Sequence, residues 1–197
     1  MSATVDLQAC LDWLSERNRD LDVTHRLVPA ALLLKASAVA AGETDGLNGQ
    51  WREDRFVPAA AVHLGVVTAV RSGGLMVPVI HDADTLPVDV LMFELRGAVE
   101  RVRFGRPRSS DLTGATLTVT NLGDLGADDV HGLIFPPQVA LVGFGAVRKR
   151  PWVVDEKILA RPVVTVTLPA DHRVSDGMAG ARFLHRIDRL LQRPGEL

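Results

Sequence analysis

The sequence of 197 residues predicts one domain of the mixed α/β class. Helix-like runs with apolar residues every three or four positions recur along the chain, and shorter β-branched runs lie between them. Glycine and proline punctuate the boundaries of these runs. The strands do not alternate strictly with helices, which argues against a doubly wound nucleotide-binding fold. An apolar fraction of 47% is enough for a real core.

The first third of the chain predicts two helices. In residues 6–19 the leucines share one face, and Asp6 is a plausible cap. Residues 28–41 predict a strongly apolar helix, with Pro29 in its first turn, where proline is tolerated. A helix this apolar is buried on most sides. Residues 42–55 are rich in turn formers and predict a loop.

The middle of the chain predicts a hairpin followed by a long helix. Residues 57–71 and 75–80 are predicted strands on either side of a Ser-Gly-Gly turn at residues 72–74. Residues 85–104 predict a helix because charged residues separate its apolar ones. The apolar residues are Leu86, Val90, Phe93, Leu95 and Val99. Residues 105–114 predict a linker that contains a capping cluster.

The last third predicts short strands and a terminal helix. The predicted strands are residues 116–120, residues 139–144, and two strands within residues 152–168 around an Asp-Glu-Lys turn. The helix runs from Met178 to Leu191, after Ser175 and Asp176, which are both natural N-cap types.

Composition excludes several classes of function. A net charge of -2 gives no overall attraction to nucleic acid or to an anionic membrane. The only basic cluster, Arg148-Lys149-Arg150, predicts a solvated turn. Cys10 is the only cysteine and is expected to be a small core residue, so no internal disulfide forms. We see no signal peptide and no apolar run long enough to span a bilayer, and expect a cytoplasmic protein.

The strongest chemical signal is residues 171–177, with the sequence Asp-His-Arg-Val-Ser-Asp-Gly. They lie between a predicted strand and a predicted helix, a junction that can hold His172 rigidly at a sheet edge. Histidine exchanges protons near neutral pH, so His172 is a candidate general base. Asp176 can brace the local backbone, and Gly177 permits a tight turn.

A second signal is the strand that delivers Thr120 into a glycine-marked loop, followed by Asn121 and Gly123. A hydroxyl donor can stabilise the oxyanion formed when a thioester carbonyl is attacked. Together with a general base, this is the minimum for direct acyl transfer without a covalent enzyme intermediate. The loop also resembles a phosphate loop, but it lacks the Gly-Lys-Ser/Thr ending.

Taken together, these motifs resemble the catalytic domain of the dihydrolipoamide acyltransferases of 2-oxo acid dehydrogenase complexes, and more distantly chloramphenicol acetyltransferase. The matching segments are Lys35-Ala36, Leu47-Asn48, residues 64–67, 74–80, 118–123 and 136–141, and the Asp-His-Arg motif. The resemblance implies a two-layer α+β sandwich with a chloramphenicol acetyltransferase-like mixed sheet. It also implies a homotrimer with the active site between subunits.

The same resemblance assigns the roles. It makes His172 the general base, Thr120 the oxyanion donor and Asp176 the structural carboxylate of the motif, with His172 and Thr120 coming from different subunits. The cosubstrate would be acyl-CoA or an acyl-carrier thioester, with no covalently bound cofactor. Asn121, Gly123 and His131 are candidate substrate-channel residues.

The sequence also departs from the family pattern. Residues 1–197 form a single catalytic domain with no lipoyl or peripheral-subunit-binding domain, and the usual arginine-rich N-terminal segment is missing. Because an arginine of that segment can pair with the motif aspartate in relatives, we expect Arg173 or Arg182 to pair with Asp176, or the carboxylate to stay partly solvated.

Two enzymatic functions and one non-enzymatic function remain open. The first is a stand-alone acyltransferase that acetylates a small-molecule hydroxyl or thiol, as in tetronate-type natural-product biosynthesis. The second is the core of a 2-oxo acid dehydrogenase complex, which moves acyl groups between dihydrolipoamide and CoA. The third is an inactive trimeric scaffold, against which the intact His172 and Thr120 argue.

Other polar and aromatic residues have simpler interpretations. His81, Asp82 and Asp84 predict a surface turn and no metal site. Trp51 and Trp152 are predicted to pack in the core or at an interface.

Overall fold

The computed structural model of the protein describes residues 1–71 and 73–197. Its α-helices in this part of the chain are α1 (Gln8–Arg17), α2 (Pro29–Glu43), α3 (Val88–Arg103) and α4 (Gly177–Leu191). Short 3-10 turns follow at Ser109–Leu112, Gly123–Leu125 and Pro194–Glu196. None of the described helices is long and apolar enough to cross a membrane.

The strands form one large sheet and two small hairpins. Those of the large sheet, in spatial order, are β1 (Ser2–Asp6), β11 (Lys157–Thr167), β9 (Leu141–Phe144), β8 (Leu117–Asn121), β4 (Leu64–Val66) and β7 (Val79–Ile80), with β10 (Arg148–Val154) paired to β11. The hairpins are β2 (Gly49–Arg52) with β3 (Arg55–Pro58), and β5 (Thr68–Ala69) with β6 (Leu75–Met76).

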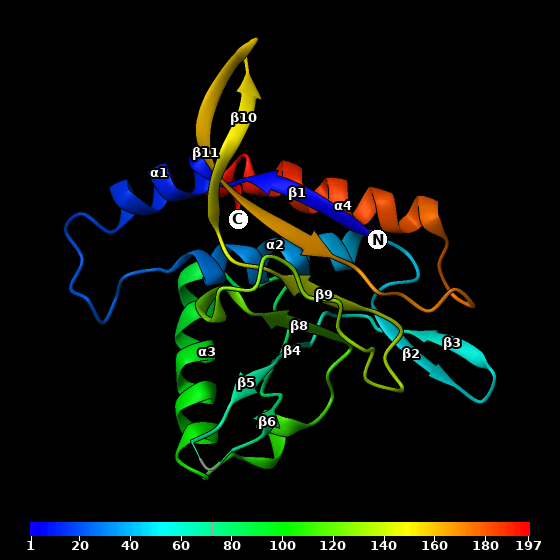
Figure 1. Ribbon diagram of the computed structural model, residues 1–197. Helices are drawn as coiled ribbons and strands as arrows, with labels where there is room; N and C mark the ends of the chain where they lie inside the picture. The colour runs from blue at the N-terminus through cyan, green and yellow to red at the C-terminus, as the bar shows by residue number, and fades with distance from the viewer. Residues whose placement is uncertain (72) are drawn as a thin grey trace.

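The large sheet is mixed, which confirms the predicted fold class. β8 runs parallel to both of its neighbours, β4 and β9, whereas β7, β10, β11 and β1 are paired antiparallel. Parallel neighbours require a crossover connection, and α3 lies within the connection between β4 and β8. Helix and sheet layers are seen in Figure 1, where α1, α2 and α4 lie along one side of the central strands.

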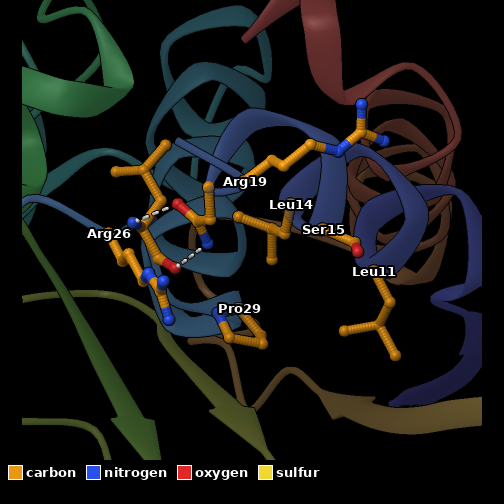
Figure 2. A pocket seen from close by; sticks show the side chains of 8 residues that line it. Leu11, Leu14, Ser15, Arg19, Arg26 and Pro29 are labelled. Atoms are coloured by element: carbon orange, nitrogen blue, oxygen red, sulfur yellow. Dashed lines mark hydrogen bonds between the residues drawn. The ribbon is translucent and has the colours of Figure 1, made fainter. Parts of the chain in front are cut away.

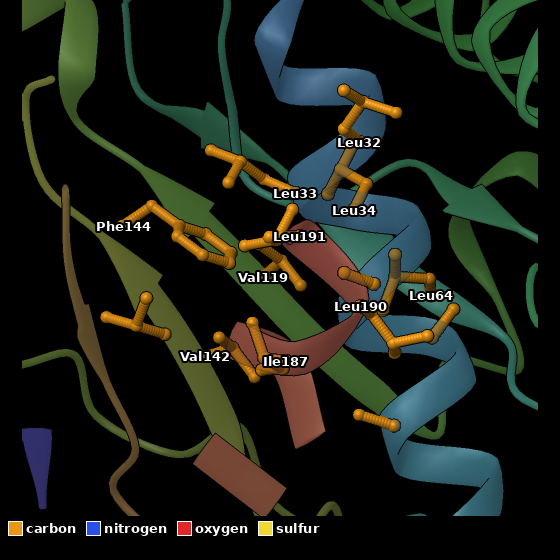
Figure 3. Close-up of a cluster of buried hydrophobic side chains, with 14 of the residues drawn as sticks. Leu32, Leu33, Leu34, Leu64, Val119, Val142, Phe144, Ile187, Leu190 and Leu191 are labelled. Atoms are coloured by element: carbon orange, nitrogen blue, oxygen red, sulfur yellow. The ribbon is translucent and has the colours of Figure 1, made fainter. Parts of the chain in front are cut away.

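The main core lies between α2, α4 and one face of the sheet. Figure 3 shows leucines of α2 meeting Ile187, Leu190 and Leu191 of α4 above Val119, Val142 and Phe144 of the strands. Ten of the fifteen residues of α2 are buried, as the apolar sequence predicted, and Pro29 is its first residue. Burial of this helix on several sides explains why it has no clear polar face.

The other face of the central strands carries small polar residues. Side chains alternate along a strand, so Thr118 and Thr120 point away from the helices that cover Val119. In register with Thr120 are Gly143 of β9 and Thr167 of β11. A Cβ at position 143 would lie 2.5 Å from Thr167 Oγ1 and 2.6 Å from the carbonyl oxygen of Val130, so this crossing requires glycine.

The β10–β11 hairpin projects from the body of the molecule (Figure 1). The basic cluster Arg148-Lys149-Arg150 was predicted to be a turn, but it belongs to β10. Arg148 and Arg150 both pair with Asp128, at 3.2 and 3.0 Å, which ties the base of the hairpin to the preceding loop. The Asp-Glu-Lys turn lies where it was predicted, because Asp155 and Glu156 adopt positive φ angles of 47° and 63°.

Several other boundaries differ from the predictions. Residues 2–6 form β1, an edge strand that no pattern indicated, and residues 57–80 form short strands where two long ones were predicted. The predicted turn at residues 72–74 includes Ser72, which lies outside the described residues. On α3 the predicted apolar face is partly wrong, because Phe93 is 73% exposed and Val90 is 41% exposed. The helix is therefore rotated so that Leu91, Met92 and Leu95 are buried.

Cys10 is a buried core residue, as predicted. Its thiol donates a hydrogen bond to the carbonyl oxygen of Leu191 at 3.0 Å. Burial, assisted by the nearby charge of Asp6, raises the pKa of the thiol to about 12. A thiol in this environment stays protonated at neutral pH and is not a nucleophile.

Candidate active site

The turn that carries His172 follows β11 directly. Ala170 forms a bridge with Ala140, and the backbone N–H of Asp171 donates to the carbonyl oxygen of Val139 at 2.7 Å. The carbonyl oxygen of Asp171 then accepts from the N–H groups of Val174 and Ser175, at 3.0 and 3.1 Å. These bonds fix the backbone on both sides of His172, as the predicted strand-to-helix junction required.

The imidazole of His172 is exposed and lines a cavity of about 370 Å³. The other residues that line this cavity are Met1, Leu168, Pro169, Ala170, Ser175, Asp176, Gly177 and Gly180. Among the described residues, no side chain or backbone group makes a hydrogen bond or ion pair with the His172 ring. Its nitrogens are therefore free to exchange a proton with a bound thiol or alcohol.

Asp176 is the N-cap of α4. One carboxylate oxygen accepts from the N–H groups of Met178 and Ala179, both at 2.9 Å. These bonds lower the pKa of Asp176, and the nearby His172 and Arg182 add smaller electrostatic contributions in the same direction. The sequence predicted either an arginine partner, Arg173 or Arg182, or a partly solvated carboxylate. In the structure Asp176 is exposed and its hydrogen bonds go to the start of the helix, because four N–H groups at a helix start need acceptors.

Arg173 pairs with a different aspartate, Asp171. Arg173 Nη2 lies 2.6 Å and Nε lies 3.0 Å from carboxylate oxygens of Asp171, and this pairing lowers the pKa of the carboxyl group. The guanidinium also lies over the ring of Trp51 in β2, with Cζ 4.3 Å from the ring centroid. Trp51 was predicted to pack in the core or at an interface, and nothing in the local sequence connects position 51 with position 173.

Thr120 is buried near the end of β8, with 7% of its surface exposed. Its hydroxyl has no hydrogen-bond partner among the described residues. Among the described residues, only one side-chain polar atom is both fully buried and without a partner, and it is Asn48 Oδ1. The Thr120 hydroxyl also lacks a partner, so it is not fully buried and retains contact with solvent. Thr118 differs, because its hydroxyl donates to Gln138 at 2.8 Å. Thr120 is thus the threonine whose hydroxyl is available to a ligand.

His172 and Thr120 of one chain are far apart. Thr120 pairs in register with Gly143 of β9. The His172 turn begins beside Ala170, which pairs with Ala140, three residues before Gly143 in the chain. That offset is about 10 Å along the strands, and the two strand spacings between β8 and β11 add about 10 Å across them. At this separation we do not expect the two side chains of one chain to act on the same carbonyl group.

The three predicted channel residues do not gather around His172. Asn121 Oδ1 accepts from the N–H of Gly123 at 2.9 Å, so this side chain shapes its own loop. Both residues line a separate cavity of about 400 Å³ at the end of the sheet, beside α2. His131 is exposed in the loop after that turn, 3.9 Å from Asp129.

A pair of histidines away from the His172 turn, His63 and His81, makes hydrogen bonds to backbone groups. His63 Nδ1 accepts from the N–H of Asp82 at 3.1 Å, and His81 Nε2 donates to the carbonyl oxygen of Ser110 at 3.0 Å. The two rings lie edge to face, with centroids 4.8 Å apart. Over the described residues, no group of three or more His, Cys, Asp or Glu side chains could hold a metal ion.

Another cavity, of about 480 Å³, lies between α1 and the start of α2 (Figure 2). The Asn18 side chain bridges its wall by bonding both the N–H and the carbonyl oxygen of Leu27, at 2.9 and 2.8 Å. Arg19 and Arg26 lie at its rim. None of the predicted site residues lines it.

A family model covers the whole chain. The model of the 2-oxoacid dehydrogenases acyltransferase (catalytic domain) family matches residues 1–197. The chain belongs to this acyltransferase family. It is 32% identical over 97% of its length to the dihydrolipoyllysine-residue acetyltransferase component of the pyruvate dehydrogenase complex of Zymomonas mobilis, of which it covers 44%. It is 33% identical over 82% of its length to the lipoamide acyltransferase component of the branched-chain alpha-keto acid dehydrogenase complex of Bacillus subtilis, of which it covers 38%.

This member of the acyltransferase family therefore spans less than half the length of these relatives. Solved structures agree with the assignment. The cubic core of a pyruvate dehydrogenase multienzyme complex superposes with a TM-score of 0.91 at 26% identity, covering 100% of this chain and 82% of that one. The dihydrolipoamide acetyltransferase of Azotobacter vinelandii gives 0.92 at 26% identity, with the same coverage of each chain.

Chloramphenicol acetyltransferase has the same fold. It superposes with a TM-score of 0.66 over 97% of this chain and 86% of that chain, at 12% identity. At this identity the likeness concerns the fold alone. The predicted chloramphenicol acetyltransferase-like sheet is thereby confirmed.

Proposed function

We propose that this acyltransferase moves an acyl group between CoA and the thiol of a dihydrolipoyl group. The observation that carries the proposal is the His172 turn: an exposed imidazole without a hydrogen-bond partner lines a cavity, on a backbone held from both sides. Such a residue is suited to general-base catalysis. The dihydrolipoyl acceptor is supported by the names of the relatives, which are acyltransferase components of 2-oxo acid dehydrogenase complexes.

The sequence alone favoured a different acceptor, a small-molecule hydroxyl or thiol. That expectation rested on finding no lipoylation motif within residues 1–197. The comparisons support the dihydrolipoyl alternative better, because both relatives described above are lipoyl-dependent by name. We therefore propose the dihydrolipoyl thiol as the acceptor.

In the proposed mechanism, a ring nitrogen of His172 removes the proton from the attacking thiol. The sulfur then bonds to the thioester carbonyl carbon, and the carbonyl oxygen becomes an oxyanion. The Thr120 hydroxyl donates a hydrogen bond to that oxyanion. When the original C–S bond breaks, the leaving thiolate takes the proton from His172. No covalent enzyme intermediate forms.

Because Thr120 and His172 of one chain are far apart, the proposed site combines two chains. We propose a homotrimer in which His172 of one subunit faces Thr120 of the next. The spacing of these residues supports their roles. The Azotobacter structure was studied for the role of a serine, a histidine and an asparagine in its catalytic mechanism. That serine precedes the histidine by the same number of positions as Thr120 precedes His172, and the asparagine follows as Asp176 does.

A direct assay tests the proposal. Purified protein is incubated with acetyl-CoA and dihydrolipoamide, or with acetyl-CoA and a small primary alcohol, and released CoA and acetylated product are measured. We expect transfer to the thiol. His172→Ala should lower kcat about 10²–10⁴-fold, because it removes the base.

The matched control is His185→Ala, since His185 is an exposed histidine on α4. It should leave kcat unchanged. Near-native turnover by His172→Ala, with chemistry limiting the rate, would show that the mechanism is wrong. Acetylation of the alcohol with no transfer to dihydrolipoamide would restore the small-molecule acceptor.

A further inference from the structure

Arg173, next to His172, is held on two sides. Its guanidinium forms a forked pair with the Asp171 carboxylate, with Nε at 3.0 Å from Oδ1 and Nη2 at 2.6 Å from Oδ2. Its flat face lies over Trp51, 4.3 Å from the ring centroid. A planar cation can accept both contacts at once, because the carboxylate binds the edge and the indole covers the face.

Trp51 is itself attached to the segment before β9 that supports the His172 turn. The N–H of Trp51 donates to the carbonyl oxygen of Pro137 at 2.7 Å, and the N–H of Asp171 donates to that of Val139 at 2.7 Å. Residues 137–139 thus lie between the β2–β3 hairpin and the turn. Gln50, the neighbour of Trp51, adds a bridge to Gln138. The backbone of Trp51 is thereby fixed relative to the backbone that carries His172.

The contact also keeps in place a side chain that would otherwise be mobile. The Arg173 side chain is 60% exposed, and a long exposed cation loses its order unless several groups hold it. Asp171, and more weakly Asp54 at the tip of the hairpin, raise the pKa of Arg173, so the charge that binds the indole is stable. Without Trp51, only the local Asp171 pair would remain.

We propose that Trp51 is a positioning residue for His172. Through Arg173 it restrains the rotation of the turn that presents the imidazole to the cavity, although it does not touch the reacting atoms. This inference rests on the proposed role of His172. The β2–β3 hairpin, although remote in sequence, would then help to orient the general base.

The test compares Trp51→Leu with Trp51→Phe in the acetyl-CoA and dihydrolipoamide assay. Leucine keeps the apolar bulk and removes the π face, whereas phenylalanine keeps a smaller π face. We expect Trp51→Leu to lower kcat about 10-fold, because small displacements of a catalytic group are costly. KM should stay within about 2-fold, since substrate binding is not altered. Trp51→Phe should recover most of the loss.

The chain offers a matched control, because Arg71 lies over Phe104 in a second cation–π pair, with Cζ 5.0 Å from the ring centroid. Phe104→Leu removes that pair and should leave kcat unchanged. If Trp51→Leu and Phe104→Leu behave alike while His172→Ala is inactive, the positioning role is overturned and the proposed mechanism stands. If His172→Ala remains active, the proposed mechanism itself fails.

A double-mutant cycle separates positioning from packing. Arg173→Lys keeps the charge but removes the planar fork, so it should lower kcat to a similar extent. Because Trp51 acts through Arg173, Trp51→Leu should have little further effect on kcat in the Arg173→Lys background. Independent, multiplicative losses would overturn the inference. Circular dichroism and native mass confirm that each variant is folded, and Trp51→Met, which also removes the π face, takes the place of Trp51→Leu in the cycle if Trp51→Leu does not fold.

Discussion

At the scale of single residues, the proposed catalytic side chains differ from similar side chains because they have no hydrogen-bond partner among the described residues. The His172 ring has no partner in the described structure, whereas His63 and His81 are committed to backbone groups. The Thr120 hydroxyl is likewise unpaired, while Thr118 bonds Gln138. A proton acceptor or oxyanion donor that is not committed to another group can contact a substrate directly, so this pattern agrees with the proposed roles.

Substituting Thr120 tests the oxyanion donor. Thr120→Val has nearly the same shape but no hydroxyl, and we expect kcat to fall about 10²–10³-fold with little change in KM. Thr120→Ser keeps the hydroxyl and should be much milder. Steady-state kinetics of both variants give the answer. Equal losses in valine and serine would mean that Thr120 serves packing.

At the scale of elements, the start of α4 depends on Asp176. Asparagine at this position can accept the same backbone hydrogen bonds, whereas alanine cannot. We expect Asp176→Ala to lower the thermal unfolding midpoint and Asp176→Asn to keep both the midpoint and most of kcat. Thermal melts and kinetics of the pair check this. An inactive but fully stable Asp176→Asn would show that the carboxylate charge itself takes part in catalysis.

The end of α3 also depends on a carboxylate. The side chain of Asp111 connects this helix to the following 3-10 turn. Arg101 Nη2 lies 2.7 Å from Asp111, and Arg108 donates its N–H at 2.8 Å. The Arg101 hydrogen bond chiefly, with smaller contributions from Arg108, lowers the pKa of Asp111 to about 2. The side chain of Asp111 is only 7% exposed, so water screens this interaction weakly.

A folded-state pKa below the unfolded value stabilises the protein at higher pH. For Asp111 the contribution is about 2 kcal/mol, complete above about pH 5 and lost as pH falls towards 2. Asp111→Asn should therefore be less stable at pH 7 and show a smaller loss between pH 5 and pH 3, as urea unfolding at several pH values would measure. Asp89→Asn, which breaks an exposed pair with Arg17, is the control and should cost little. An unchanged pH dependence in Asp111→Asn would contradict the assignment.

At the scale of the whole molecule, the separation of His172 from Thr120 requires an assembly if both act on one substrate. In a ring of three subunits each site takes its base from one chain and its oxyanion donor from the next. Mass measurement in solution should therefore give a trimer. A monodisperse, active monomer would contradict the shared site.

Mixed trimers provide the sharper test. His172→Ala and Thr120→Val chains, each inactive alone, are co-expressed with different tags and the mixed species are isolated. Each isolated mixed trimer has one interface of its three that joins an intact histidine to an intact threonine, so about one third of wild-type activity should return. Mixed trimers confirmed by mass but without activity would show that both residues act within one chain.

Local sequence determined much of this protein. Pro29, the apolar face of α4, the turn at residues 155–156 and the capping aspartate all act through neighbours within a few positions, so their patterns predicted the elements correctly. The His-x-x-x-Asp-Gly motif likewise predicted a rigid turn between a strand and a helix. The family resemblance, carried by short motifs in order along the chain, was confirmed across residues 1–197.

Tertiary structure decided what depends on residues that are distant in sequence. The order of β8, β9 and β11 placed Thr120 far from His172. The start of α4 supplied the hydrogen-bond partners of Asp176, for which the sequence had left open an arginine or solvent. Packing against α2 and the sheet turned Phe93 outward, although its spacing predicted a buried face. The contact of Trp51 with Arg173 joins positions that no local periodicity relates. Such features follow from how whole elements pack, and a single sequence encodes that packing only through the sum of many weak interactions.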